Sequence, residues 1–168
     1  MMVAPHERAD WPFLQCSPTT LFLKPENMLQ AIQTLEKIEY HVCHFDCSSD
    51  AALLASAVKE LKWEAQFGSC PDMLNFDALN DAVRSEPFDT ADNAVVVLKD
   101  FQKLWDRDER QGFHVLDIFT SASRDYLLFG KHLLTFVHVS DPRFETQKPG
   151  ALPAWWNGRE WFHKDRGI

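Results

Sequence analysis

Apolar and polar residues recur with the period of helices in some parts of the chain and of strands in others. The helical period is clearest after Pro25. Apolar side chains return every three or four positions over 28–38, with polar side chains on the opposite side, which is typical of an amphipathic helix. The same spacing follows the N-cap cluster Ser48-Ser49-Asp50 and predicts a second helix over Ala51–Trp63. We expect the apolar positions of both helices to be buried.

Later parts of the chain contain further helical signals and the residues that interrupt them. Phe113–Leu128 has helical spacing of apolar residues and is followed by Gly130, which can adopt a left-handed cap without strain. Phe101–Trp105 predicts a short helical turn. Trp63–Leu74 contains glycine, proline and aspartate, and is predicted to be a loop. We expect the polar segment Met1–Cys16 to be loosely ordered.

Apolar runs with the composition of β-strands cover Thr19–Leu23, Tyr40–Cys47, Asn93–Lys99 and Lys131–Val139. The valine run in Asn93–Lys99 is nearly continuous, as expected of a strand covered on both faces in a parallel sheet. From Tyr40 onwards the order is strand, helix, helix, strand, helix, strand, which requires right-handed crossovers between parallel strands. We therefore predict an α/β fold with a parallel three-stranded sheet packed with helices, to which Thr19–Leu23 could add one extra strand.

The segment Asn75–Arg84 predicts a short helix with two chemically different faces, ending near Ser85-Glu86-Pro87. Asp77 and Asp81 lie one turn apart on one face, an arrangement that costs a few tenths of a kcal/mol. The macrodipole favours Asp77 in the first turn, so the pair is either simply solvated or kept to bind a cationic partner. The apolar stripe is formed by Phe76, Leu79 and Val83, and the residues that flank the acidic pair are Asn80 and Arg84.

The C-terminal segment Pro142–Ile168 holds three tryptophans around Asn157-Gly158. Asn-Gly between short apolar runs is the strongest local hairpin signal, so we predict a β-hairpin. An isolated hairpin is marginal in water and must dock on another surface. Because monomers rarely expose large apolar patches, packing on the chain's own body is favoured over a dimer or partner contact.

Composition fits one folded domain with extensions, since 45% of the 168 residues are apolar and 12% are aromatic. We divide the chain into an N-terminal extension (1–39), a central domain (40–141) and a Trp-rich C-terminal extension (142–168). The net charge is −8, and the window from Phe45 to Arg110 alone contains 14 acidic and 7 basic residues. This acidic centre argues against direct binding of nucleic acid and suits a basic protein partner.

The sequence shows no secretory signal and no transmembrane segment. Glu7, Arg8 and Asp10 leave no room for the apolar core of a secretory signal, and no run approaches the roughly 20 apolar residues that span a bilayer. The four cysteines are too sparse for a disulfide scaffold. We expect a cytoplasmic protein that does not associate with membranes.

The order of motifs between Tyr40 and Val139 resembles the barstar family, intracellular protein inhibitors of small secreted ribonucleases. The family's usual signature is an aromatic-Gly pair followed closely by Asn-hydrophobic-Asp-Ala-Leu-x-Asp, matched here by Phe67-Gly68 and Asn75-Phe76-Asp77-Ala78-Leu79-Asn80-Asp81. Ser69–Leu74 makes the loop several residues longer than the family's pattern. The resemblance implies a small layered α/β fold with a parallel sheet, and no catalysis.

The resemblance also implies a partner, a basic ribonuclease or nuclease toxin whose active site is blocked by the loop and the acidic helix. Asp81 matches the aspartate that occupies the nuclease's phosphate site, and Asp77 matches the other aspartate of the motif. The expected partner-binding residues are Asp77, Asp81, Asn80, Arg84, Phe67, Gly68, Asn75 and Asp72. No cofactor, metal ion or catalytic residue is expected. The alternative is a non-inhibitory barstar-like interaction or regulatory module that engages its target through the Trp-rich tail.

Two other kinds of chemistry are considered and not favoured. On a strand, His41, Cys43 and Cys47 could share a face while His44 points away, but zinc sites usually use closer cysteine pairs together with a second pair elsewhere. Buried cysteines on a strand are therefore the preferred interpretation. An enzyme would need an activated nucleophile, and no Gly-x-Ser-x-Gly elbow or phosphate loop accompanies the candidates Ser121, Ser123, His114, His132 and His138.

Overall fold

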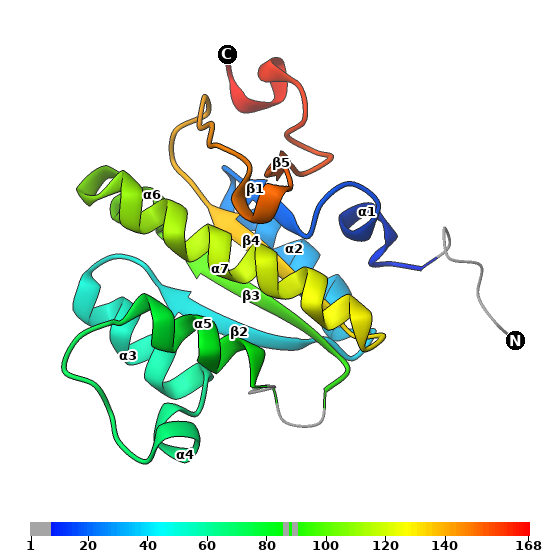
Figure 1. Ribbon diagram of the computed structural model, residues 1–168. Helices are drawn as coiled ribbons and strands as arrows, with labels where there is room; N and C mark the ends of the chain where they lie inside the picture. Colours follow the sequence, from blue (N-terminus) through cyan, green and yellow to red (C-terminus); the bar gives the residue numbers. More distant parts are fainter. Residues whose placement is uncertain (1–7, 86–87, 89–90) are drawn as a thin grey trace, which may run out of the picture.

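Parallel strands form the centre of the fold, with helices on both sides (Figure 1). In this computed structural model, residues 8–85, 88 and 91–168 are described, and within them the sheet has five strands in the order β2-β3-β4-β1-β5. The strands are β1 (Thr19–Phe22), β2 (His41–Asp46), β3 (Asn93–Lys99), β4 (His132–His138) and β5 (Trp155–Trp156). The predicted α/β class and parallel sheet are thus confirmed.

The sheet has more strands than the predicted three, or four with Thr19–Leu23 added. The three strands of the central segment do lie side by side as β2, β3 and β4. The N-terminal strand β1 then joins β4 in parallel, with Thr19 opposite Thr135, and β5 joins β1 at the edge. The two extensions of the chain therefore complete the sheet of the central segment.

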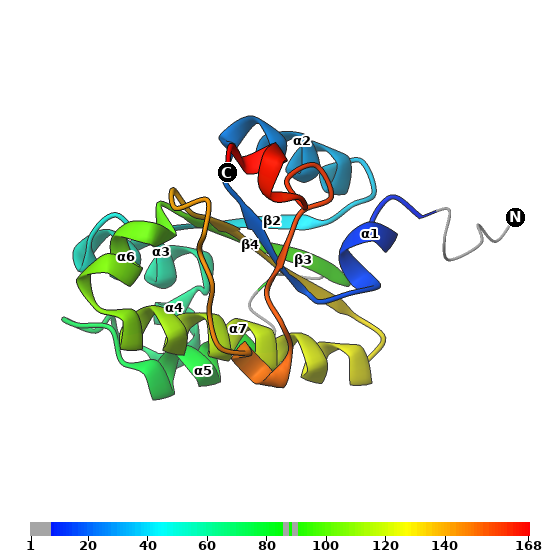
Figure 2. The ribbon, with the colours of Figure 1, turned by 90° about the horizontal axis from the view of Figure 1, so that it is seen from above.

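Helices cover the two faces of the sheet unequally (Figure 2). Helix α2 lies on one face, whereas α3, α5 and α7 lie on the other. The helices are α1 (Trp11–Leu14), α2 (Pro25–Glu36), α3 (Asp50–Glu60), α4 (Trp63–Phe67), α5 (Phe76–Arg84), α6 (Phe101–Arg107) and α7 (Glu109–Leu128), with short 3-10 turns η2 (Pro149–Ala151) and η3 (His163–Arg166). Among the residues described, no helix is both long and apolar enough to cross a membrane.

Strand β3 shows how the sequence builds two cores. Ala94, Val96 and Leu98 face the larger core beneath α3, α5 and α7, whereas Val95 and Val97 face the smaller core beneath α2. All five side chains are at most 2% exposed. The strand is therefore covered on both faces, as its continuous apolar run predicts.

Two of the observed helices differ from the prediction. Helix α7 begins at Glu109, where Asp108 accepts a hydrogen bond from the Gln111 amide, rather than at Phe113. Gly112 lies inside this helix and allows it to approach α6, since a Cβ there would be 2.9 Å from Trp105 Cε3. The predicted loop 63–74 begins with the short helix α4.

The N-terminal part is also more structured than expected, because α1 lies within the segment 1–16, although residues 1–7 are outside the described residues. Helix α5 ends at Arg84, close to the predicted position, and Glu86 and Pro87 are outside the described residues.

The hairpin predicted around Asn157-Gly158 is wrong. A type I′ turn needs positive φ at both residues, and neither residue has it. Instead, the Asn157 amide and side chain both donate to the Leu21 carbonyl oxygen, at 3.1 and 3.0 Å, and so fix β5 parallel to β1. The tail does pack on its own chain, as expected, and Trp155 stacks on Trp161 with ring centroids 5.0 Å apart.

Candidate functional site

Helix α5 is firmly held at its start and along its inner face. The Asn75 side chain caps the helix by accepting hydrogen bonds from the amides of Asp77 and Ala78, at 2.9 and 3.1 Å. Leu79 and Val83 are buried in the larger core. Tyr126 of α7 donates a hydrogen bond of 2.8 Å to the Val83 carbonyl oxygen. Asn75 is therefore a positioning residue, which fixes the direction of the helix that it precedes.

Asp77 and Asp81 lie on the outer face of this helix, and both side chains are exposed. Neither carboxylate forms an ion pair or a side-chain hydrogen bond with any part of the chain that the structure describes. Two like charges one turn apart thus have no ion-pair partner among the described residues. This is the arrangement that a cationic partner would neutralise.

The one basic residue of the helix, Arg84, is directed away from this acidic pair. Its Nε donates to Asp125 Oδ2 of α7 at 2.7 Å, and its Nη1 donates to the Asn80 side chain. Asn80 and Arg84, both predicted to bind a partner, are therefore linked to each other and to α7. Their hydrogen bonds leave the charge of Asp77 and Asp81 uncompensated.

Phe67 and Gly68 close the short helix α4. Gly68 has φ of +74° and ends the helix in the left-handed region, which favours glycine. The Phe67 ring lies 5.1 Å from the ring of buried Trp63 and remains 43% exposed. The aromatic-Gly pair thus turns the chain out of α4 and into the segment that leads to α5.

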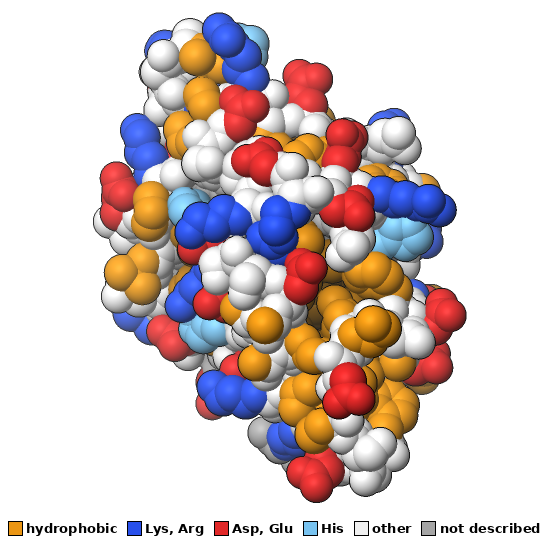
Figure 3. All heavy atoms as spheres, turned by 90° about the vertical axis from the view of Figure 1, so that its left-hand side faces the viewer, with side chains coloured by type: hydrophobic (Ala, Val, Ile, Leu, Met, Phe, Trp, Pro, Cys, Tyr) orange, Lys and Arg blue, Asp and Glu red, His pale blue; other side chains and the backbone are white. Residues whose placement is uncertain are grey.

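The segment between Gly68 and α5 forms one wall of an apolar groove of about 660 Å³. Helix α3 forms the other wall, and Figure 3 shows hydrophobic side chains gathered around a hollow at the lower right of this face. The side chains that give the groove its apolar character include Leu54, Val58, Met73, Leu74 and Phe76. Met73 is 75% exposed. A surface of this kind is suited to receiving an apolar side chain.

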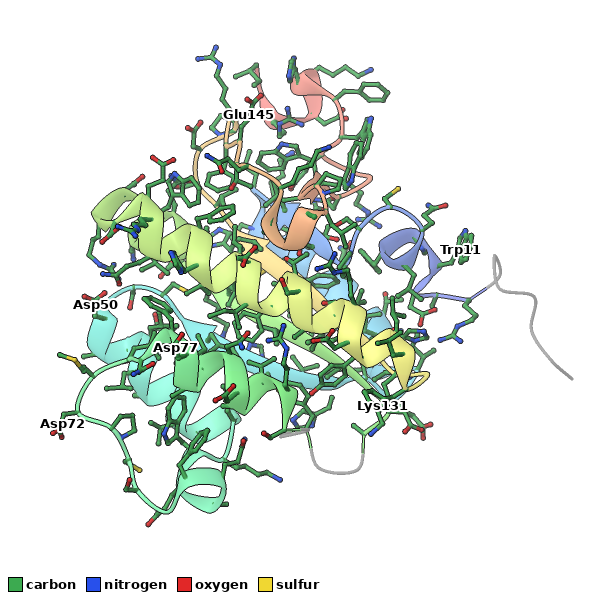
Figure 4. All side chains as sticks on the ribbon, in the orientation of Figure 1. Trp11, Asp50, Asp72, Asp77, Lys131 and Glu145 are labelled. Carbon is green, nitrogen blue, oxygen red and sulfur yellow. The ribbon has the colours of Figure 1, made fainter. Side chains whose placement is uncertain are left out.

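Carboxylates lie beside this groove. Asp50 and Asp72 line it, and Asp77 follows the groove residue Phe76 directly; Figure 4 shows the three aspartates on the same side of the molecule. Asp50 is paired with Arg107 at 2.9 Å, whereas Asp72 has no ion pair within the described residues. The groove and the acidic face of α5 together make one surface with an apolar centre and negative neighbours.

The sequence located the acidic part of this surface but not the groove. Leu54 and Val58 belong to the apolar stripe predicted to be buried, yet the structure leaves them only half-buried. Met73-Leu74, an apolar pair inside a loop, is the signal that points to the groove. Apolar side chains in a loop are stabilised by packing against another element. Here α3 packs against them on one side, so the other side of the groove stays open.

The serines and histidines considered for catalysis do not form an activated nucleophile. Ser123 donates its hydroxyl hydrogen to the Phe119 carbonyl oxygen at 2.9 Å. His132 faces Asp10 and His138 faces Asp100. In the described part of the chain no serine hydroxyl is hydrogen-bonded to a histidine, which is the contact that base activation requires. Cys43 and Cys47 are free thiols buried on or beside β2, as expected.

Comparison of the sequence and the structure with protein-family models, curated proteins and solved structures gave no significant match.

Proposed function

We propose that the protein is an inhibitor of a basic ribonuclease, and that it blocks the nuclease's active site with α5 and the segment before it. The observation that carries the proposal is the pair Asp77 and Asp81, exposed on a capped helix and without an ion-pair partner among the described residues. A ribonuclease site holds phosphate with cations, so two preformed carboxylates can occupy the places of two phosphates. The order β2, α3, α5, β3, α7 and β4 supports the proposal, since it is the strand and helix order of the barstar-like motif with the short helices α4 and α6 added.

Rigidity favours this use of α5. Asn75 caps the helix, and Leu79 and Val83 anchor it in the core, so little conformational entropy is lost when the carboxylates are bound. The groove beside them accepts an apolar side chain from the rim of the nuclease cleft. Together these features supply the charged centre and the apolar anchor that tight protein interfaces combine.

The test is inhibition of a barnase-type ribonuclease, measured by cleavage of a fluorogenic RNA substrate at increasing inhibitor concentration. We expect inhibition by the natural chain and a loss of affinity of about 30-fold or more for Asp81→Asn, because a cation in the cleft is left unpaired. Asp77→Asn should cost less, because Asp81 is the residue that the resemblance places in the nuclease's phosphate site.

The matched control is Glu145→Gln, which removes the same charge from an exposed loop at the opposite end of the molecule (Figure 4). It should inhibit as the natural chain does. Full inhibition by an Asp77→Asn/Asp81→Asn double variant would overturn the proposed mode. Absence of inhibition with several basic ribonucleases would overturn the proposed function itself.

A non-inhibitory interaction module is the second candidate, and the exposed aromatic residues of the tail favour it. Trp155, Trp161 and Phe162 are 38%, 42% and 62% exposed. Deletion of the tail would not test this idea cleanly, because it would also remove β5. The pair of variants Trp161→Ala and Phe162→Ala keeps β5, and loss of a co-purifying partner in these variants but not in Asp81→Asn would identify the tail as the binding surface.

A further inference from the structure

A cluster of three different metal-binding side chains lies at the β2 edge of the sheet, outside the surface described above. His41 and Cys43 are two positions apart on β2 and therefore share a face. Glu60, at the end of α3, packs over them. The histidine nitrogen, cysteine sulfur and carboxylate oxygen all lie within 4.8 Å of one another. The sequence suggested Cys47 as the third residue of such a cluster, but the structure places Glu60 there instead.

The separation of these atoms is close to that of a zinc site. Zinc bonds of about 2.0 Å to nitrogen and 2.3 Å to sulfur put the ligand atoms of a tetrahedral centre about 3.5 Å apart. Side-chain rotations that move each atom by about 1 Å would thus complete the site. The His41 ring makes no hydrogen bond to any described residue, so both of its nitrogens are available.

The charges and burial of the three residues also fit a divalent cation. Cys43 is fully buried, whereas the Glu60 side chain is 13% exposed and His41 is half-buried, so solvent reaches the cluster from one side. A thiolate, a carboxylate and a neutral imidazole would make the site neutral around a dication, which reduces the cost of burying charge. Lys59, which contacts Glu60 at 3.2 Å, is 82% exposed and is free to move away.

We propose that His41, Cys43 and Glu60 bind one Zn²⁺ ion, with water as the fourth ligand. A mixed nitrogen, sulfur and oxygen set suits zinc, and three protein ligands leave one position open. Binding displaces the proton of the Cys43 thiol, whose pKa is raised by burial and by the negative charge of Glu60. The bound ion would pin the end of α3 to the edge strand of the sheet.

Cobalt reports on such a site directly, because a cobalt–thiolate bond gives a charge-transfer band in the near ultraviolet. The full chain carrying Cys16→Ser and Cys70→Ser, which removes both exposed thiols, is titrated with Co²⁺ and then with Zn²⁺. We expect one Co²⁺ per chain, a thiolate band, and displacement of Co²⁺ by Zn²⁺. Glu60→Gln and His41→Gln, at half-buried positions, should each weaken binding by about tenfold or more.

Cys43→Ser should abolish the thiolate band, whereas the matched control Cys47→Ser, another buried thiol of the same region, should retain it. Near-ultraviolet circular dichroism checks that each variant is folded. If Cys43→Ser does not fold, the two half-buried variants decide the outcome. Absence of a thiolate band in the parent chain, or unchanged affinity in both Glu60→Gln and His41→Gln, would overturn the proposal.

Discussion

Asp10 is a buried charge that is satisfied by Arg8, two residues away, and by Tyr40, from a distant part of the chain. It is 0% exposed, receives two hydrogen bonds from Arg8 at 2.9 and 2.6 Å, and receives one from the Tyr40 hydroxyl at 2.8 Å. Burial alone would raise its pKa, but the hydrogen bonds from Arg8 and Tyr40 outweigh burial and hold the pKa of Asp10 below its ordinary value. The native state thus binds this proton more weakly than the unfolded chain does.

The sign of the resulting pH dependence follows from that difference. The stabilisation by Asp10 is present above the unfolded pKa of about 3.9 and is lost as the pH falls through the lower folded pKa. We expect Asp10→Asn to lower the free energy of unfolding by about 2–4 kcal/mol at neutral pH, with a difference from the natural chain that shrinks below about pH 4. Urea unfolding at a series of pH values measures this. A difference that stays constant down to the acid limit would contradict the assignment.

Glu160 connects the C-terminal tail to the start of α2. Its buried carboxylate accepts hydrogen bonds from the amides of Leu23 and Lys24 and from the side chains of Asn27 and Asn157, at 2.7–2.9 Å. In Glu160→Gln, an amide NH₂ would face these donors. We expect a loss of about 2–4 kcal/mol in the free energy of unfolding, measured in urea, because buried donors lose a charged acceptor. Glu145→Gln, on an exposed loop, should be neutral.

Close approach of η2 to α7 depends on one glycine. Gly150 has φ of +55°, and a Cβ there would lie 2.8 Å from the Ser121 backbone nitrogen. Its amide donates to Asp117 Oδ1 at 2.7 Å. Gly150→Ala should therefore lower the free energy of unfolding by about 1–3 kcal/mol. Gly158→Ala is the matched control, since no atom lies within 4 Å of its Cβ position. Equal midpoints of thermal unfolding for the two variants would show that η2 can move away from α7 at no cost in stability.

Elements defined by local pattern were predictable, and elements defined by distant partners were not. Strand β3 was predicted at its observed bounds, Asn93–Lys99, because its apolar run needs no further information. Asn157-Gly158 is locally typical of a hairpin turn, but Asn157 donates to the carbonyl oxygen of Leu21, which is 136 residues away in the chain. Gly112 looks like a helix breaker until the neighbouring Trp105 shows why a small residue is needed.

The same limit applies to the candidate site. The spacing of Asp77 and Asp81 was enough to place both on one helix face. That Arg84 turns to Asp125 instead depends on where α7 lies. The groove depends likewise on the path of the segment 69–74 beside α3. The pattern of charges along a helix can therefore be predicted from the sequence, whereas the ion pairs that these charges form in the fold cannot.

At the scale of the whole molecule, the two extensions add strands to the sheet, while the central segment carries the acidic surface. Strands β1 and β5 come from the two ends of the chain and extend the sheet beyond β4, away from β2 and the helices that border the groove. The tail also carries more basic than acidic residues, and the central window holds the excess of acid. The molecule is thus electrically asymmetric, with its negative charge concentrated on the segment that includes α5.

This asymmetry predicts how binding to a basic ribonuclease responds to salt. Charge complementarity acts mainly on the association rate, so added salt should lower that rate towards the neutral range of about 10⁵–10⁶ M⁻¹s⁻¹ and change the dissociation rate much less. Stopped-flow fluorescence at several salt concentrations measures the slope of the logarithm of the association rate against the logarithm of the salt concentration. In the Asp77→Asn/Asp81→Asn variant the slope should flatten, whereas Glu145→Gln should keep it, although Glu145→Gln alters the net charge in the same direction. A slope that is the same in all three proteins would mean that the charges which guide association lie elsewhere on the molecule, and that α5 acts only after contact.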